Sequence, residues 1–200
     1  MKKAEIYLIN TRTVKEKEEY IRSFLPEDRV EKADRYARES DRLLSLGAGY
    51  LVYRFVGGSY VDDRGKPRSD RLFFSISHSG ELAALAVTAE GEIGIDIEES
   101  AQDRDFEALA EFAFGDEELE SFKKGEHFLR IFTAKESLAK AEGSGLRNKT
   151  KLIPALPLDG TAVYKNKTYF RHTLDVEGYF GSVTLEGDDF LMITEVIYDL

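Results

Sequence analysis

The segment Gly94-Ile95-Asp96-Ile97-Glu98 has the period-two pattern of a strand and carries two carboxylates two residues apart. Side chains at positions i and i+2 of a strand point to the same face, so we expect Asp96 and Glu98 to project together. Adjacent carboxylates repel each other unless a positive charge lies between them, and Mg²⁺ prefers carboxylate oxygens together with water and phosphate. The pair indicates a divalent-cation site, although an ordinary solvent-facing strand edge would give the same pattern.

A helix predicted over residues 126–142 places Phe132, Glu136 and Lys140 on one face. Glutamate four residues before lysine stabilises an exposed helix by ~0.3 kcal/mol without any function. A third carboxylate near Asp96 and Glu98 would, however, complete a set of metal ligands. Lys140, one turn further along, would then face a bound diphosphate.

Two further segments could bind anions. The sequence Ser75-Ile76-Ser77-His78-Ser79-Gly80 ends a predicted short strand with donors that suit phosphate, or forms a plain turn that satisfies its own backbone. The basic residues of a predicted helix are either a solvated face or a local anion site, and they are Arg29, Lys32, Arg35, Arg38 and Arg42.

Composition restricts the class of protein. The chain has 200 residues with a formal net charge of −10, which opposes non-specific attraction to nucleic acid or to anionic membrane surfaces. It contains no cysteine, which excludes disulfides, thiolate catalysis and cysteine-ligated zinc. No apolar run approaches the ~20 residues of a membrane-spanning helix, and the first residues lack the pattern of a secretory leader, so we expect a cytoplasmic protein.

The hydrophobic periodicity predicts alternating strands and helices. We expect a strand over 6–9, helices over 14–25 and 28–55, a turn over 62–67, a strand over 73–76, a hairpin of 82–88 and 93–98, the helix 126–142 ended by Gly143, and a last hairpin of 179–185 and 190–197. Residues 87–92 resemble residues 183–188, which indicates either two similar halves or a chance repeat of a common turn. The strand after the second turn has no acidic pair, so only the first half could hold this metal site.

Taken in order, these segments resemble the 4′-phosphopantetheinyl transferases of the larger, pseudo-dimeric type that activates surfactin synthetase. The motifs that carry the resemblance are Gly65-Lys66-Pro67, Ser77-His78-Ser79-Gly80, residues 94–98, Lys135-Glu136-Ser137-Leu138-Ala139-Lys140, and Gly143-x-Gly145-Leu146. The resemblance implies an α+β fold with two similar α/β halves, residues 1–98 and 99–200. Each half would have a small antiparallel sheet packed on a long helix.

The implied enzyme transfers 4′-phosphopantetheine from coenzyme A to a serine of an apo acyl or peptidyl carrier protein and releases 3′,5′-ADP. By this resemblance Asp96, Glu98 and Glu136 would hold Mg²⁺, Glu136 would take the serine proton, and Lys140 would pair with the diphosphate.

The resemblance also implies a binding site for coenzyme A. Ser77 and His78 would touch its phosphates, with His78 near the 3′-phosphate, and Arg42, Lys32 and Arg29 would complete that clamp. The backbone of Gly65, Lys66 and Pro67 would lie along the adenine. Phe132 departs from the family, which often has tryptophan at this position.

Carrier proteins are usually acidic, as is this chain, so a local patch must overcome the repulsion between them. The candidates are exposed aromatics in the 106–114 stretch and the cations Lys123, Lys124, Arg130, Arg147, Lys149 and Lys151. Two similar halves in one chain would permit a monomer. The rival readings are a non-catalytic module that binds a carrier protein or coenzyme A on the same fold, and a Mg²⁺-dependent phosphodiesterase.

Overall fold

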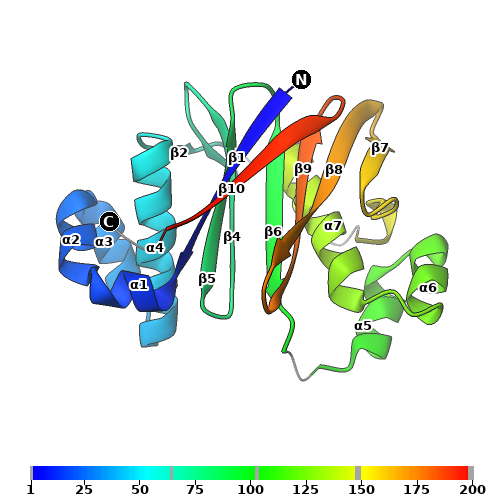
Figure 1. Cartoon of the computed structure of the whole chain (residues 1–200), viewed down its shortest axis with the longest axis horizontal. Helices are drawn as coiled ribbons and strands as arrows, with labels where there is room; N and C mark the ends of the chain where they lie inside the picture. The colour runs from blue at the N-terminus through cyan, green and yellow to red at the C-terminus, as the bar shows by residue number, and fades with distance from the viewer. Residues whose placement is uncertain (1, 64, 102–103, 147–149, 198–200) are drawn as a thin grey trace.

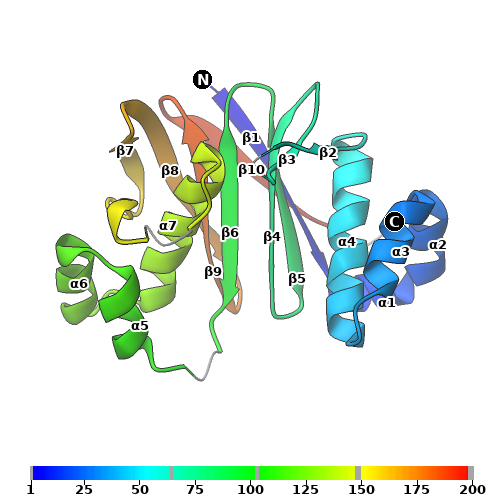
Figure 2. The same cartoon turned by 180° about the vertical axis from the view of Figure 1, so that it is seen from behind.

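The computed structural model describes residues 2–63, 65–101, 104–146 and 150–197. Two sheets pack face to face in the middle of the molecule, with helices on the outer side of each (Figure 1). The same order of helices, sheet, sheet and helices is seen from behind (Figure 2). The predicted α+β class is confirmed.

The elements of the N-terminal half begin with a strand that leads into four helices. They are β1 (Lys2–Asn10), α1 (Thr11–Glu16), α2 (Glu18–Phe24), α3 (Glu27–Asp34), α4 (Glu39–Phe55), β2 (Tyr60–Val61), β3 (Pro67–Arg68), β4 (Phe73–Ser79) and β5 (Leu82–Thr88).

The C-terminal half places its helices between its first strand and the others. Its elements are β6 (Ile93–Glu99), α5 (Phe106–Ala113), α6 (Asp116–Lys123), α7 (Phe128–Glu142), the 3-10 turn η1 (Thr150–Leu152), β7 (Gly160–Tyr164), β8 (Lys167–Val176), β9 (Tyr179–Glu186) and β10 (Phe190–Ile197).

The helix predicted over 28–55 is two helices, α3 and α4, separated by residues 35–38. Arg38 is the N-cap residue of α4, and Glu39 and Asp41 lie in its first turn. Carboxylates are stabilised by the positive end of the helix dipole, so this acidic stretch starts a new helix. The basic periodicity that runs across the break hid it from the sequence pattern.

Both predicted hairpins are wrong, because successive strands cross from one sheet to the other. The first sheet has the order β10-β1-β5-β4, and the second has the order β6-β9-β8-β7. β5 therefore leads into the second sheet through β6, and β9 leads back into the first through β10, which pairs parallel to β1. A period-two pattern identifies a strand but carries no information about which strand it pairs with.

The two crossings coincide with the internal repeat in the sequence. Gly91 and Gly187 lie at the corresponding turns with positive φ values of 148° and 115°. Each of the two sheets has four strands and a long helix, α4 or α7, on its outer side, which is consistent with two similar halves (Figure 1). The sheets do not divide at residue 98, since β6 belongs to the second sheet and β10 to the first.

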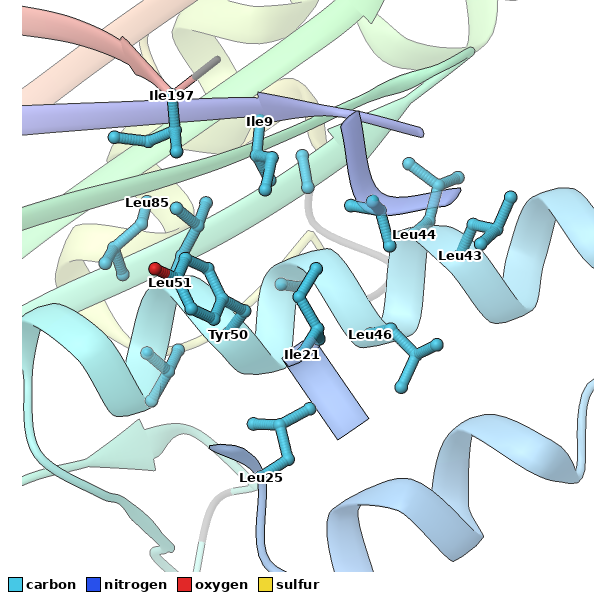
Figure 3. Close-up of a cluster of buried hydrophobic side chains, with 14 of the residues drawn as sticks. Ile9, Ile21, Leu25, Leu43, Leu44, Leu46, Tyr50, Leu51, Leu85 and Ile197 are labelled. Atoms are coloured by element: carbon cyan, nitrogen blue, oxygen red, sulfur yellow. The ribbon is translucent and has the colours of Figure 1, made fainter. Parts of the chain in front are cut away.

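Apolar side chains fill the spaces between these layers. Leu51 of α4 lies toward Leu85 of the first sheet, and Leu46 of α4 and Ile9 of β1 belong to the same buried cluster (Figure 3). Between the sheets, the isoleucines of β6 at positions 93, 95 and 97 meet alternate residues of β1 and β5. Among the described residues, no helix has the length and apolar character needed to cross a membrane.

On the outer side of the second sheet, α7 lies unusually close to β6. A Cβ atom built on Gly94 would lie 1.9 Å from the carbonyl oxygen of Ser137 and 2.6 Å from the backbone nitrogen of Ala141. Glycine at position 94 is therefore what allows α7 to pack directly on the strand that carries Asp96.

A buried ion pair ties α7 to its other neighbours. The Lys135 ammonium contacts the Glu118 carboxylate of α6 and donates to the backbone oxygen of Ile153 at 2.6 Å. The second carboxylate oxygen of Glu118 accepts from the backbone N–H of Ala155 at 2.7 Å. Lys135 is fully buried and Glu118 nearly so, so each charge depends on the other for solvation.

Gly94→Ala should lower the free energy of unfolding by on the order of 3 kcal/mol, because α7 must move away from β6. The matched control is Gly178→Ala, at φ +77° with no atom within 4 Å of the new Cβ. It should cost only the roughly 1–2 kcal/mol of a left-handed residue. Urea unfolding measures both, and equal losses would contradict the close packing.

Lys135→Met and Glu118→Gln should each cost about 3–5 kcal/mol, because each leaves an uncompensated buried charge. The double variant should be less destabilised than the sum of the two single variants. Urea unfolding of all four proteins gives the coupling free energy. A coupling of zero would show that the two charges do not solvate each other.

Candidate active site

The packing of α7 on β6 brings Lys140 to Asp96. The Lys140 ammonium lies 2.7 Å from Asp96 Oδ1, 3.0 Å from the backbone oxygen of Ile95 and 3.0 Å from Ser77 Oγ. Asp96 is only 5% exposed. The sequence predicted that the helix face with Glu136 and Lys140 would lie near the carboxylates of residues 94–98. The contact between Lys140 and Asp96 confirms this for one pair.

Glu136 lies in the electrostatic field of the same cluster. Burial raises the pKa of Glu136 to about 7, the negative charges of Asp96 and Glu98 add to this rise, and Lys140 opposes it. Burial also raises the pKa of Asp96, against the effect of the Lys140 ammonium. Three carboxylates thus share the neighbourhood of one ammonium, which leaves an excess of negative charge.

The donor chemistry of this cluster fits a hard divalent cation. Asp96 Oδ2 is buried and has no hydrogen-bond partner, while Oδ1 accepts hydrogen bonds from both Lys140 and Ser77. Carboxylate oxygens are the ligands that Mg²⁺ prefers. Within the described ranges, no three His, Cys, Asp or Glu side chains have the spacing of a formed metal site. Binding a cation would therefore have to draw the carboxylates together.

A pocket of about 240 Å³ opens beside the cluster. Its wall comes from residues 65–67, from residues 74–76 of β4, and from the end of α7 with Lys140 and residues 143–145. Gly143 ends α7 in the left-handed conformation, at φ +88°, as the sequence predicted. Lys140 lies in the wall of this pocket and also contacts Asp96, so it connects the pocket with the carboxylate cluster.

The Lys66 side chain is already committed to the protein. Its ammonium contacts Glu92 at 2.6 Å and the backbone oxygen of Ala141 at 3.2 Å. Burial lowers the pKa of Lys66, while Glu92 opposes the shift. Lys66 therefore fastens the segment 65–67 to the end of α7, and a ligand in the pocket would meet mainly the backbone and Pro67.

Ser77 and His78 lie within β4, because the strand continues past the predicted end at residue 76 to Ser79. The Ser77 hydroxyl is buried and donates to Asp96 Oδ1 at 2.8 Å. His78 is exposed. Neither is among the described residues that line the pocket, so their contacts with coenzyme A stay a prediction.

The predicted basic clamp also lies outside the pocket wall. Arg42 pairs with Glu18 and lies 3.9 Å from Glu39. Arg29 donates to the backbone oxygen of Ser45 at 2.7 Å, and Lys32 is exposed on α3. The role of these cations in binding a 3′-phosphate is likewise a prediction.

The predicted carrier patch is only partly exposed. Phe112 is 74% exposed and Leu109 37%, whereas Phe114 is fully buried against α7. Lys123, Lys124, Arg130 and Lys151 are exposed. Arg147 and Lys149 lie outside the described residues.

Sequence reasoning missed the bonds made by the serines of β4. Ser79 donates to Glu98 Oε2 at 2.8 Å, and Ser75 and Ser77 accept from backbone N–H groups of β6. The signal was present in the period-two order Ser75, Ser77, Ser79, which places all three on one face of a strand. On the sequence alone, the same residues also fit the polar end of a shorter strand.

Comparison with known proteins relates the second half of the chain to one family. Residues 92–188 match the family model described as the 4′-phosphopantetheinyl transferase superfamily. The matched segment contains both β6 and α7, and hence all three carboxylates and Lys140.

Individual curated proteins show the same relationship. The chain is 33% identical to the 4′-phosphopantetheinyl transferase HetI of Nostoc sp. over 156 residues, which are 66% of this chain and 65% of HetI. It is 33% identical over 104 residues to the 4′-phosphopantetheinyl transferase AcpT of Salmonella typhimurium, 48% of this chain and 54% of AcpT. A putative 4′-phosphopantetheinyl transferase of Synechocystis sp. is 32% identical over 99 residues, 46% of this chain and 39% of that protein.

The chain thus spans less than two thirds of the length of these curated relatives. The family model and the named relatives support a relationship of this chain to the 4′-phosphopantetheinyl transferase superfamily, carried by the segment that holds Asp96, Glu98, Glu136 and Lys140.

Proposed function

We propose that this protein transfers 4′-phosphopantetheine from coenzyme A to a serine of an apo acyl or peptidyl carrier protein and releases 3′,5′-ADP. The observation that carries the proposal is the carboxylate and lysine cluster between β6 and α7, which opens on a pocket through Lys140. We further propose the pseudo-dimeric type, because one chain forms two four-stranded sheets, each covered by a long helix.

The pocket would receive the nucleotide end of coenzyme A. Its wall at residues 65–67 offers backbone and a proline ring, which suit the flat face of adenine, and Lys66 holds this wall against α7. A diphosphate that extends from the pocket toward Asp96 would meet the Lys140 ammonium, a point charge suited to phosphate oxygens.

Asp96, Glu98 and Glu136 are the residues that would hold Mg²⁺ in this proposal. The ion would supply neutralisation of negative charge on the diphosphate during phosphoryl transfer. Two observations support this assignment: Asp96 Oδ2 is buried without a hydrogen-bond partner, and burial together with the neighbouring carboxylates raises the pKa of Glu136.

Glu136 is the residue we assign to the serine proton, directly or through one water. The carrier serine oxygen would bond to the phosphorus that bears the pantetheine arm, as the bond from that phosphorus to the bridging oxygen of the diphosphate breaks. The proton passes to the Glu136 carboxylate, and the bridging oxygen leaves with 3′,5′-ADP. Catalysis here consists largely of positioning and charge neutralisation.

The partner surface we propose lies on α5 and its neighbours. Phe112 and Leu109 form an exposed apolar centre, and Lys123, Lys124, Arg130 and Lys151 supply positive charge for an acidic carrier. Since both halves contribute to one cluster, through β4 and through α7, we propose that a monomer is active. The absence of cysteine agrees with a reducing cytoplasmic setting for the reaction.

With Mg²⁺, coenzyme A and a panel of apo carrier proteins, the protein should raise the mass of at least one carrier by one phosphopantetheine. Glu136→Gln should lower kcat/KM by about 10²–10⁴-fold as expected for loss of a general base, and Asp96→Asn should abolish turnover. Glu16→Gln, an exposed glutamate on α1, is the matched control and should keep full activity.

Mass spectrometry of the carriers decides this test. No mass shift with any carrier would overturn the proposed transfer. Coenzyme A binding without transfer would favour the alternative of a non-catalytic binding module. Unchanged turnover of Asp96→Asn or Glu136→Gln would refute their assigned roles.

Mg²⁺ should stabilise the folded protein, because an ion that binds only the native state shifts unfolding by mass action. At about 100 times its dissociation constant the ion should raise the Tm by roughly 5–10 °C. Differential scanning fluorimetry should show this shift in the wild type and in Glu16→Gln but not in Asp96→Asn. An equal shift in Asp96→Asn would remove Asp96 from the metal ligands.

A further inference from the structure

The edges of the two sheets meet at β4 and β6. β4 is the last strand of the first sheet and β6 the first strand of the second, and they lie side by side in both views (Figure 1, Figure 2). Edge strands expose backbone N–H groups that need partners. On β6, the backbone N–H groups that point away from β9 face β4.

Serine hydroxyls of β4, not its backbone carbonyls, satisfy these groups. We call Ser75, Ser77 and Ser79 the serine ladder. Their hydroxyl oxygens accept from the backbone N–H groups of every second residue of β6. The donors are Ile95 at 3.2 Å, Ile97 at 3.4 Å and Glu99 at 3.0 Å, in the same order. Because both numbers rise by two at each step, the strands run parallel here in a single register.

The chemistry of the hydroxyl group then fixes where each proton goes. A serine hydroxyl has one proton and two acceptor positions. Ser77 Oγ accepts from the Ile97 N–H and also from the Lys140 ammonium at 3.0 Å, and neither partner can accept a proton in return. The only proton of Ser77 is therefore available to Asp96 Oδ1, 2.8 Å away.

Ser79 repeats this arrangement one step along. It accepts from the Glu99 N–H and donates to Glu98 Oε2 at 2.8 Å. Ser75 accepts from the Ile95 N–H at the start of the ladder, and both carboxylate bonds come from the other two serines. Two members of the ladder, Ser77 and Ser79, are thus directed at carboxylates.

We propose that Ser77 and Ser79 are positioning residues, which orient Asp96 and Glu98 for a divalent cation. This inference rests on the proposed function for its catalytic meaning. At Asp96, Ser77 and Lys140 both occupy Oδ1 and leave the buried Oδ2 without a partner, which is the orientation that a metal ligand needs. Partners of this kind orient ligating carboxylates, and their loss typically costs 10–100-fold in metal affinity.

The serine ladder also couples the two sheets to the orientation of the carboxylates. It joins a strand of one sheet to a strand of the other, so the spacing between the two halves of the molecule sets the orientation of the carboxylates. This explains why hydroxyls rather than carbonyls face β6, since a carbonyl could accept from the N–H group but could not donate to the neighbouring acid.

The test is binding of Mn²⁺ in the presence of coenzyme A, followed by the electron paramagnetic resonance signal of free Mn²⁺. Ser79→Ala and Ser77→Ala should raise the Mn²⁺ dissociation constant by about 10–100-fold. Ser23→Ala, which removes an exposed hydroxyl of α2 that donates to the backbone oxygen of Tyr20, is the control and should keep the wild-type constant. Ser79→Thr retains the hydroxyl at a partly exposed position and should restore Mn²⁺ binding.

Wild-type Mn²⁺ affinity in Ser79→Ala, or an equal loss in Ser23→Ala, would overturn the proposal. Thermal unfolding of each variant reports on its fold, and Ser79, which is only partly buried, keeps the test valid if Ser77→Ala does not fold. Steady-state kinetics separate positioning from substrate contact. Positioning by Ser79 predicts a lower kcat and a higher Mg²⁺ requirement at an unchanged KM for coenzyme A, and a change confined to that KM would contradict it.

Failure of this inference and failure of the proposed function would look different. If the wild type modified carriers and Ser79→Ala bound Mn²⁺ normally, the transferase would stand without the ladder. If the wild type modified no carrier and the Mn²⁺ constants followed the predicted order, the ladder would stand as part of a metal site with another activity.

Discussion

The close contact between the Lys140 ammonium and Asp96 Oδ1, at 2.7 Å, is the interaction on which the site depends. One positive charge lies among three carboxylates, two from β6 and one from α7, and Asp96 is almost wholly buried. Such an arrangement is under-compensated, because the interior screens like charges poorly. A cluster built in this way is suited to receive a further cation, and the account of function follows from that property.

Two features of the fold maintain this contact. Gly94 lets α7 pack directly on β6, and the buried pair of Lys135 and Glu118 fastens the outer face of α7 to α6 and to the backbone near Ile153. Glu136 follows Lys135 in the sequence, so the residue that anchors the helix stands next to the residue that faces the acids. Stability and chemistry are therefore coupled through a single helix.

Several features of the candidate site could be predicted from the sequence, because they depend on residues that are close together in the chain. The alternation in residues 94–98 fixed which face carries Asp96 and Glu98, the four-residue spacing aligned Glu136 with Lys140, and Gly143 marked the end of the helix. The motif Gly65-Lys66-Pro67 lines a pocket, and its predicted contact with adenine stays a prediction. Its lysine side chain, however, pairs with Glu92 and not with solvent.

What the sequence could not provide was the pairing of distant segments. The strands before and after Gly91 and Gly187 look like hairpins, yet each pair is split between two sheets by a choice made in tertiary packing. The serines of β4 were visible, but their role depends on a neighbouring edge strand that no local pattern predicts. The break between α3 and α4 was hidden for a related reason, since charged residues continue across it with helical spacing.

The most direct measurement of the central claim is the anomalous scattering of Mn²⁺ in crystals grown with coenzyme A. The account predicts one strong peak between β6 and α7, in contact with Asp96, Glu98 and Glu136, with the diphosphate of coenzyme A on its open side. A bound coenzyme A with no metal peak at these three carboxylates would contradict it.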